Sequence, residues 1–214
     1  MNFHIITLFP KSFGSYLGES ILKRAIENKK LKIFFYNPRD FAENKWKRVD
    51  RPPYGGGPGL VIEALPVVKA IESALKKVKS RKSKIIFLNP RGKQFDNVYA
   101  KKVSKNYRNL IIVCGRYEGI DARVRKIFKM DDVSVGPFIL TGGELPAMVI
   151  IDAVSRQVPG ILGNTDSLEE KRVSTSQVYT RPEVFKYKGK SYRVPKILLS
   201  GHRAKIDEWK RGRK

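Results

Sequence analysis

Short runs of β-branched and aromatic residues alternate with amphipathic stretches along most of this 214-residue chain. The runs at 3–9, 84–89 and 109–114 are dominated by apolar residues, as in strands that are buried on both faces of a sheet. Between the first two runs, apolar residues recur at a helical interval from Phe13 to Ala25. Strands that alternate with helices are typical of parallel sheets covered by helices. We therefore predict an α/β fold with a mostly parallel sheet and flanking helices.

The same patterns predict the individual elements. The predicted strands are 3–9, 31–37, 84–89, 109–114 and 131–135. The predicted helices, besides the one between Phe13 and Ala25, are 67–79, 97–105 and 144–156. At the start of the last helix, Thr141 and Glu144 have the spacing of a capping box.

The character of the sequence changes at Pro159. Residues 159–177 are polar and turn-rich, as expected of a linker. Residues 178–214 are basic and carry aromatic residues among the cations. Aromatic rings stack on RNA bases while cations meet phosphates, although the same rings could form a small core. We predict a domain at 1–158, a linker at 159–177 and a second domain at 178–214.

The charge of the chain favours a polyanionic partner. The sequence has 44 Lys and Arg against 20 Asp and Glu, which gives a net charge of +24. Nucleic acid is the simplest partner, and the alternative is that excess lysine only decorates solvated surfaces. Cys114 is the only cysteine, and the only histidines are His4 and His202. We therefore predict no disulfide framework, no metal site and a reducing, cytoplasmic compartment.

The sequence has no pattern of a membrane protein. Its longest apolar run, around 148–154, is interrupted by Asp152 and is far shorter than the roughly 18 residues of a membrane span. The N-terminal stretch MNFHIITLF has neither the basic region nor the cleavage site of a signal peptide. We expect no membrane partner and no secretion signal.

Four loops are rich in glycine or polar residues. LNPRG at 88–92, CGRYEGID at 114–121 and SVGPFILTGGELPAM at 134–148 each begin where a predicted strand ends. Because ligands bind outside the carboxyl ends of parallel strands, these three predict a small-molecule pocket lined by main-chain groups. The fourth, PYGGGPG at 53–59, is neither a Walker loop nor a dinucleotide fingerprint. Its glycines suit positive φ or close approach of another group, and the alternative is a flexible surface loop.

Five motifs taken in order resemble the bacterial tRNA (guanine-N1)-methyltransferases of the SPOUT class. They are PYGGGPG, CGRYEGID, GGELPAM with IDAVSRQVPGILG, VYTRPEV and LLSGHRAKI. The resemblance covers essentially the whole chain. It implies S-adenosylmethionine-dependent methylation of N1 of the guanosine immediately 3′ of the anticodon in tRNA, which supports maintenance of the reading frame.

The resemblance also implies an architecture. The family forms a homodimer with a composite active site, and its donor-binding domain ends in a trefoil knot, which is a rare exception to the rules of chain topology. Relatives usually continue beyond the position of Lys214, so we expect a shortened, mainly helical C-terminal domain that binds tRNA. Two other functions stay open: a related SPOUT methyltransferase with a ribose or ribosomal RNA target, and a non-catalytic RNA-binding protein.

By this resemblance, the methyl donor is held mostly by backbone groups. The implied donor-binding residues are Leu88, Gly115, Val135, Gly136, Pro137, Phe138, Ile139 and Leu140. Asp166 matches the family's base, which takes the proton from N1, and Arg156 matches an arginine beside O6 of the guanine. From the residues alone, a helix cap or a solvated linker charge is the favoured interpretation of Asp166. Arg156 is interpreted equally well as a cation near a helix C-terminus.

The resemblance places a further set of residues beside the RNA substrate. They are Asp50, Tyr54, Gly55, Gly56, Arg116, Glu118 and Arg203, although Arg116 and Glu118 could instead pair with each other.

The sequence also departs from the family pattern. Pro137 and Phe138 replace the usual Asp and Tyr, Arg51 replaces a second acid after Asp50, and Arg203 stands at the usual histidine. Methyl transfer itself requires no metal, and Mg²⁺ assistance of RNA binding or proton removal stays open.

Overall fold

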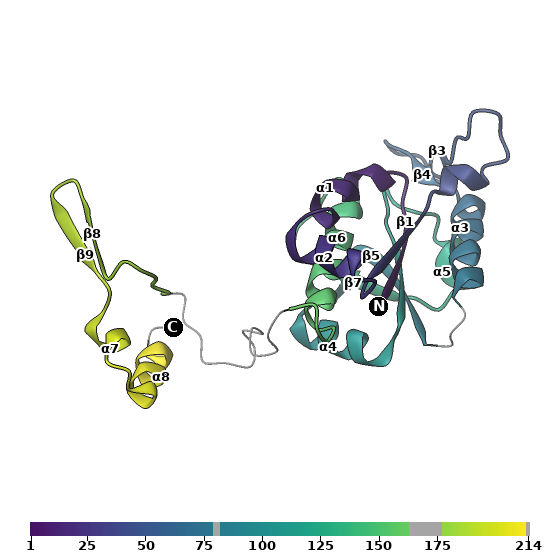
Figure 1. Ribbon diagram of the computed structural model, residues 1–214. Helices are drawn as coiled ribbons and strands as arrows, with labels where there is room; N and C mark the ends of the chain where they lie inside the picture. Colours follow the sequence, from purple (N-terminus) through teal and green to yellow (C-terminus); the bar gives the residue numbers. More distant parts are fainter. Residues whose placement is uncertain (79–81, 163–176, 213–214) are drawn as a thin grey trace. The chain divides into compact units, whose positions relative to one another are not determined.

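The chain forms two compact units. The computed structural model describes residues 1–78, 82–162 and 177–212 (Figure 1). The first unit is Met1–Leu162 and the second is Gly163–Lys214. Residues 163–176, which make up most of the predicted linker, lie outside the described residues.

The first unit is built on a five-stranded sheet in the order β2-β1-β6-β5-β7, and all its strand pairs are parallel (Figure 1). The strands are β1 (Asn2–Ile6), β2 (Lys32–Tyr36), β5 (Ser83–Gln94), β6 (Asn109–Val113) and β7 (Asp131–Ser134). Along β6, Leu110 and Ile112 enter one core, while Ile111 and Val113 enter a second core on the opposite face. This strand is therefore apolar throughout because both of its faces are buried, and the predicted parallel sheet is confirmed.

Helices cover both faces of the sheet. The core that contains Leu110 also receives residues from α1 (Gly14–Leu17), α2 (Ser20–Glu27), α4 (Asn97–Asn106) and α6 (Glu144–Arg156). The core that contains Ile111 receives residues from α3 (Ala64–Lys77) and α5 (Arg123–Ile127). Two short 3-10 helices, η1 (Pro10–Phe13) and η2 (Pro38–Phe41), follow β1 and β2. No helix within 1–78, 82–162 or 177–212 combines the length and apolarity needed to cross a membrane.

Strand β5 is longer than predicted. It pairs with β7 at residues 86–88 and again at Lys93 and Gln94, with a shift of register between the two stretches. The predicted loop LNPRG is therefore a bulge inside a strand. Pro90 hid this continuation, because proline cannot donate to a strand ladder and normally ends a strand. Gly92 permits it, since a Cβ at that position would lie 2.5 Å from the backbone nitrogen of Val133.

A small antiparallel pair, β3 (Asp50–Arg51) and β4 (Val61–Ile62), lies outside the main sheet. The glycine segment 53–59 connects its two strands. The pair is attached to the loop after β6, because the amide of Ile62 donates to the carbonyl of Gly119 at 2.9 Å. The glycine segment therefore belongs to the same end of the unit as the loops predicted to form the pocket.

The second unit contains a hairpin that the sequence analysis did not predict. Strands β8 (Val184–Tyr187) and β9 (Lys190–Arg193) pair antiparallel, and the helices α7 (Lys196–Leu199) and α8 (Arg203–Arg211) follow. Lys188 and Gly189 both have positive φ, 48° and 76°, as a tight two-residue hairpin turn requires. The rings of Phe185 and Tyr192 stack across the strands with centroids 5.1 Å apart. The expectation of a mainly helical domain missed this hairpin because its strands are only four residues long and do not alternate strictly between apolar and polar residues.

Candidate active site

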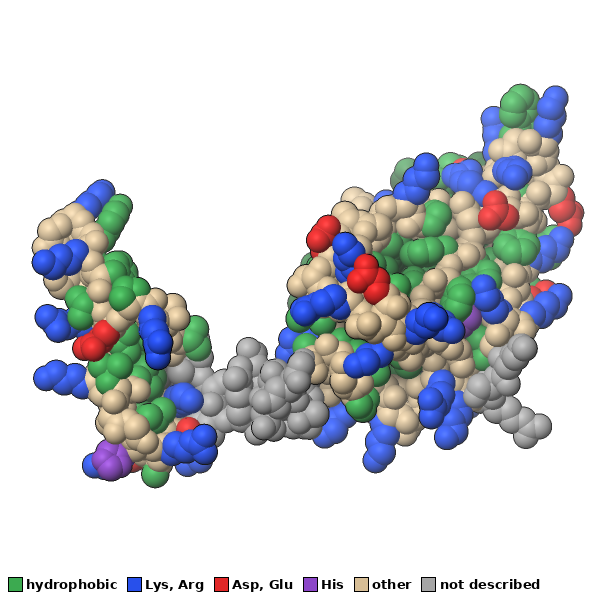
Figure 2. All heavy atoms as spheres, in the orientation of Figure 1, with side chains coloured by type: hydrophobic (Ala, Val, Ile, Leu, Met, Phe, Trp, Pro, Cys, Tyr) green, Lys and Arg blue, Asp and Glu red, His purple; other side chains and the backbone are tan. Residues whose placement is uncertain are grey.

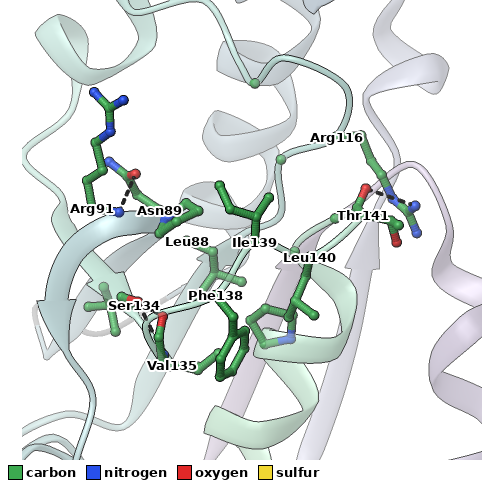
Figure 3. A pocket seen from close by; sticks show the side chains of 18 of the residues that line it. Leu88, Asn89, Arg91, Arg116, Ser134, Val135, Phe138, Ile139, Leu140 and Thr141 are labelled. Atoms are coloured by element: carbon green, nitrogen blue, oxygen red, sulfur yellow. Dashed lines mark hydrogen bonds between the residues drawn. The ribbon is translucent and has the colours of Figure 1, made fainter.

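A cavity of about 700 Å³ opens beside the bulge of β5 and the carboxyl ends of β6 and β7 (Figure 3). Its volume is typical of a site for a small organic ligand. Three segments line it: the bulge of β5, the loop after β6 and the loop between β7 and α6. The pocket predicted from three strand ends is thus present as one cavity.

The β5 wall of the cavity is held by Asn89. Its side-chain oxygen accepts a hydrogen bond from the amide of Arg91 at 3.0 Å, and its amide group donates to Asp132 at 3.2 Å. Asp132 also pairs with Arg125 at 2.8 Å. These two hydrogen bonds and the ion pair therefore hold the bulge beside β7.

The loop after β7 supplies an apolar wall. Phe138, Ile139 and Leu140 all line the cavity, and Ile139 is 84% exposed (Figure 3). Ser134 ties the base of the loop, since its hydroxyl donates to the carbonyl of Gly136 at 2.9 Å. A Cβ on Gly136 would lie 2.2 Å from the ring of Phe138, so only glycine allows this ring position. Exposed apolar side chains around a cavity suit the flat face of a base or another ring.

A buried carboxylate links the other two walls. Arg116, in the loop after β6, pairs through Nε with Glu144 at 2.9 Å. It also donates from a terminal nitrogen to the carbonyl of Thr141 at 3.2 Å (Figure 3). The second oxygen of Glu144 accepts a hydrogen bond from Thr7, at the end of β1, at 2.7 Å. The side chain of Glu144 is only 4% exposed. The Arg116 to Glu144 pair therefore holds the loop after β6 against the loop before α6.

This arrangement corrects two readings of the sequence. Gly143 is the N-cap of α6 and no side chain caps the helix, so the predicted capping box of Thr141 and Glu144 is wrong. The carboxylate turns inward because Thr7 and Arg116 compete successfully for it. Arg116 forms its ion pair with Glu144, so the alternative pairing with Glu118 is not observed.

The glycine segment ends beside the cavity. A Cβ on Gly59 would lie 2.6 Å from a carboxylate oxygen of Glu118, which lines the cavity, and the amide of Glu118 donates to the carbonyl of Leu60 at 3.0 Å. Gly55 and Gly56 have φ of 89° and 79°, as the sequence analysis anticipated for this loop. Tyr54 is fully exposed.

The protonation states of Cys114 and Asp121 limit the reactions that side chains near the cavity can carry out. Burial raises the pKa of the Cys114 thiol well above its usual value, and the charge of Glu144 adds to the rise. The thiol is therefore neutral and is no nucleophile. A hydrogen bond from Arg123 lowers the pKa of Asp121, which stays ionised. No cluster of three metal-ligating side chains occurs in the part of the chain that the structure describes.

Comparison with known proteins places the chain in a family. A family model described as tRNA (Guanine-1)-methyltransferase TrmD matches residues 1–214. The chain belongs to this family. A tRNA (guanine-N(1)-)-methyltransferase of Clostridioides difficile (strain 630) is 42% identical over 99% of this chain and 91% of its own length. Proteins of the same name from Alkaliphilus oremlandii and Geobacter metallireducens are 46% and 44% identical, over 97% and 99% of this chain and 84% and 85% of their own lengths.

A methyltransferase family implies S-adenosylmethionine as the methyl donor, and the cavity fits such a molecule. The donor combines an adenine ring, a ribose and a charged amino acid chain. The apolar side chains around Ile139 suit the ring, and the main-chain groups exposed at Gly115 suit its polar edge. Glu118 and Arg116 supply charges at the same cavity.

The structure brings together most of the predicted donor site. The residues that line the cavity are Leu88, Gly115, Val135, Gly136, Phe138, Ile139 and Leu140, whereas Pro137 is exposed and not part of the lining. Of the predicted RNA-facing residues, Arg116 and Glu118 line the cavity, while Asp50, Tyr54, Gly55 and Gly56 lie outside its lining.

Two further predicted residues lie in helices. Arg156 is the last residue of α6, and Arg203 is the first residue of α8 in the second unit. Asp166 falls outside the described residues. Thr7 belongs to no motif that would indicate a role, and Glu144 was predicted to cap a helix. The only feature of the sequence that could have indicated the inward-facing role of Glu144 is its position immediately after two glycines, at the end of a strand-to-helix loop.

Proposed function

We propose that the protein transfers a methyl group from S-adenosylmethionine to N1 of guanine in tRNA, at the nucleoside immediately 3′ of the anticodon. One observation carries the proposal: the cavity beside the bulge of β5 and the carboxyl ends of β6 and β7, in a chain that matches this methyltransferase family over its whole length. Such modification would support maintenance of the reading frame. Residues 1–158 would bind the donor, 159–177 would link the domains and 178–214 would bind tRNA. The knot expected of this fold belongs to the same proposal.

In the proposed reaction the donor supplies the methyl group, and the protein orients the reactants and removes a proton. The bound donor supplies a methyl group on a sulfonium, so the sulfur–carbon bond breaks as the bond from carbon to N1 forms, and S-adenosylhomocysteine leaves. The loops around Gly115 and Ile139 orient the donor and exclude water, so that the methyl carbon lies in line with N1. Asp166 accepts the proton from N1, and Arg156 hydrogen-bonds O6, where negative charge grows. The target base leaves its stack to reach the cavity, and Mg²⁺ could only assist, because the transfer itself requires no metal.

The direct test uses a tRNA transcript in which G follows the anticodon and is itself preceded by G. We expect label to pass from the donor to N1 of that guanosine, as mapped by mass spectrometry. Label on a ribose, or on ribosomal RNA alone, would assign a different methyltransferase. Salt-dependent tRNA binding without donor binding would assign a non-catalytic RNA-binding protein instead.

Asp166→Ala tests the proposed base. We expect kcat to fall about 10²- to 10⁴-fold, which is the usual contribution of a positioned base, while the calorimetric Kd of the donor is unchanged. Glu169→Ala is the matched control, because it removes an acid from the same segment and should leave kcat near the wild-type value. Full activity of Asp166→Ala would remove Asp166 from the mechanism.

The composite site of a homodimer has its own test. If Asp166 of one subunit serves the donor pocket of the other, then coexpression of Asp166→Ala with Gly136→Val should restore activity that neither variant has alone. Gly136→Val is expected to impair donor binding, because its added carbons would displace the ring of Phe138, which lines the cavity. No restored activity, or a stable active monomer by light scattering, would contradict the composite dimer.

A further inference from the structure

We infer that the loop 43–49 is an RNA-binding element in which the Trp46 ring stacks on an unpaired base beside the target guanine. The inference rests on the proposed function and adds a contact that is separate from the donor pocket. The loop projects beside β3 and β4 (Figure 1), and basic and hydrophobic side chains gather on this projection (Figure 2).

Most of the surface of Trp46 is exposed and is not covered by other residues of the protein. Its side chain is 70% exposed, and the contact recorded for its ring is with Nζ of the neighbouring Lys45, 5.5 Å from the centroid. A large aromatic surface left in water is unfavourable unless a partner covers it. An indole ring offers a flat face that suits a nucleic acid base.

The loop that carries Trp46 is held in a fixed turn. Asn44 spans the turn: its side-chain oxygen accepts from the amide of Arg48 at 2.9 Å, and its side-chain nitrogen donates to the Arg48 carbonyl at 2.6 Å. Lys47 occupies the left-handed region with φ of 50°, and its amide donates to the Asn44 carbonyl at 3.0 Å. Val49, fully buried, anchors the far end of the turn. A preformed turn reduces the conformational entropy that would be lost when Trp46 binds.

The charges around Trp46 fit a polyanion. Glu43 is already paired with Lys69 at 2.6 Å, so its charge is compensated. Within the described residues, no ion pair is recorded for Lys45, Lys47 or Arg48. Three cations around one exposed ring are the combination that binds phosphates and bases of single-stranded RNA.

The loop 43–49 is positioned so that an RNA bound to it could also reach the cavity. Val49 leads directly into β3, and the amide of Glu63, which follows β4, donates to the Val49 carbonyl at 2.7 Å. The segment between these two strands ends with Gly59 against Glu118 of the cavity. One continuous stretch of chain therefore runs from Trp46 to the rim of the pocket. Unpaired nucleotides that flank a flipped guanine are the RNA chemistry expected there.

Fluorescence of Trp46 tests the contact directly. Trp46 and Trp209 are the two tryptophans, so the variant Trp209→Phe reports on Trp46 alone. The probe is an anticodon stem-loop RNA with G on the 3′ side of the anticodon. We expect saturable quenching of Trp46 by this RNA, and no change of its emission with vesicles of phosphatidylglycerol. Emission that responds to the vesicles and not to the RNA would overturn the inference in favour of a membrane surface.

Kinetics of substituted proteins give a second measurement. We expect Trp46→Ala to raise KM for tRNA about tenfold, with kcat and the Kd of the donor unchanged, and Trp46→Phe to recover most of the loss. The control Val98→Ala removes an exposed apolar side chain from α4, on the opposite face of the sheet from α3, and should change neither constant. Equal KM values for wild type and Trp46→Ala would contradict the stacking contact.

The cations have a matched test of their own. The double variant Lys45→Ala and Lys47→Ala should reduce the slope of log affinity against log salt by about 1.4, the value for two contacts to single-stranded phosphates. Lys101→Ala with Lys105→Ala, on α4, should leave the slope unchanged. Wild-type protein that methylates tRNA without quenching of Trp46 would overturn this inference alone. Wild-type protein that transfers no methyl group would instead contradict the proposed function.

Discussion

At the scale of single residues, Glu144 decides how the two loops after β6 and β7 are held beside the cavity. Its carboxylate is buried and bonded on both oxygens, to Thr7 and to Arg116. A buried charge is tolerated only when it is paired and hydrogen-bonded, as this one is. Arg116 then also holds the carbonyl of Thr141. We regard Glu144 as a positioning residue, because it acts through Arg116 on the cavity that we propose to bind the donor.

Glu144→Gln tests this role with little change of volume. We expect the free energy of unfolding to fall by about 1.5–3 kcal/mol, the range for hydrogen bonds to charged groups, and donor affinity to weaken about tenfold. The measurements are thermal unfolding and calorimetric titration of the donor. Glu63→Gln is the control, since its pair with Arg51 is largely exposed and contributes at most about 1 kcal/mol. Unchanged stability and donor affinity of Glu144→Gln would remove Glu144 from this role.

At the scale of elements, the start of α6 lies close to the end of β6 at one wall of the cavity. The amide of Gly143, the N-cap of α6, donates to the carbonyl of Gly115 at 2.9 Å. A Cβ on Gly143 would lie 2.7 Å from the Cα of Cys114 at the end of β6. Because backbone atoms occupy that space, the helix begins where it does only with glycine at this position.

Gly143→Ala should therefore destabilise the first unit. The helix must move away from β6, and overpacking of this kind costs about 1–3 kcal/mol. Thermal unfolding would measure the effect, and donor titration would show weaker binding. Gly14→Ala is the matched control, because a Cβ there meets nothing within 4 Å and the backbone is helical. We expect that variant to be about 0.4–1 kcal/mol more stable than wild type. Equal melting temperatures for Gly143→Ala and wild type would show that the junction can relax.

At the scale of the whole molecule, the net charge of +24 should make the binding of tRNA depend on salt much more strongly than the binding of the methyl donor. Binding of tRNA releases counterions from phosphates, whereas binding of a small donor inside a cavity does not. With about six phosphate contacts, the affinity for tRNA should fall about 10³-fold between 50 mM and 200 mM salt. Titrations of tRNA and of the donor at both salt concentrations measure the difference. Equal salt dependence of the two affinities would contradict this division.

Local patterns accounted for much of the molecule. The apolar runs predicted the strands of the main sheet, and glycine-rich loops at three strand ends predicted the cavity. The hairpin of the second unit was missed because its four-residue strands do not alternate strictly between apolar and polar residues. The predicted strand ended before Pro90, although β5 continues beyond it, because a bulge within a strand leaves no periodic signal in the sequence. The role of Asp166 stays a prediction, because the residue lies outside the described part of the chain.

The sequence by itself determined the α/β class, the parallel sheet, the loops that line the cavity and the resemblance to a methyltransferase family. These features depend on periodicity, turn chemistry and ordered motifs, which can be read along the chain. Only the tertiary structure showed that Glu144 faces Thr7, 137 residues away, and that Gly59 meets Glu118. Such contacts depend on how packed layers bring distant segments together, and in the sequence an inward-facing acid looks the same as a helix cap.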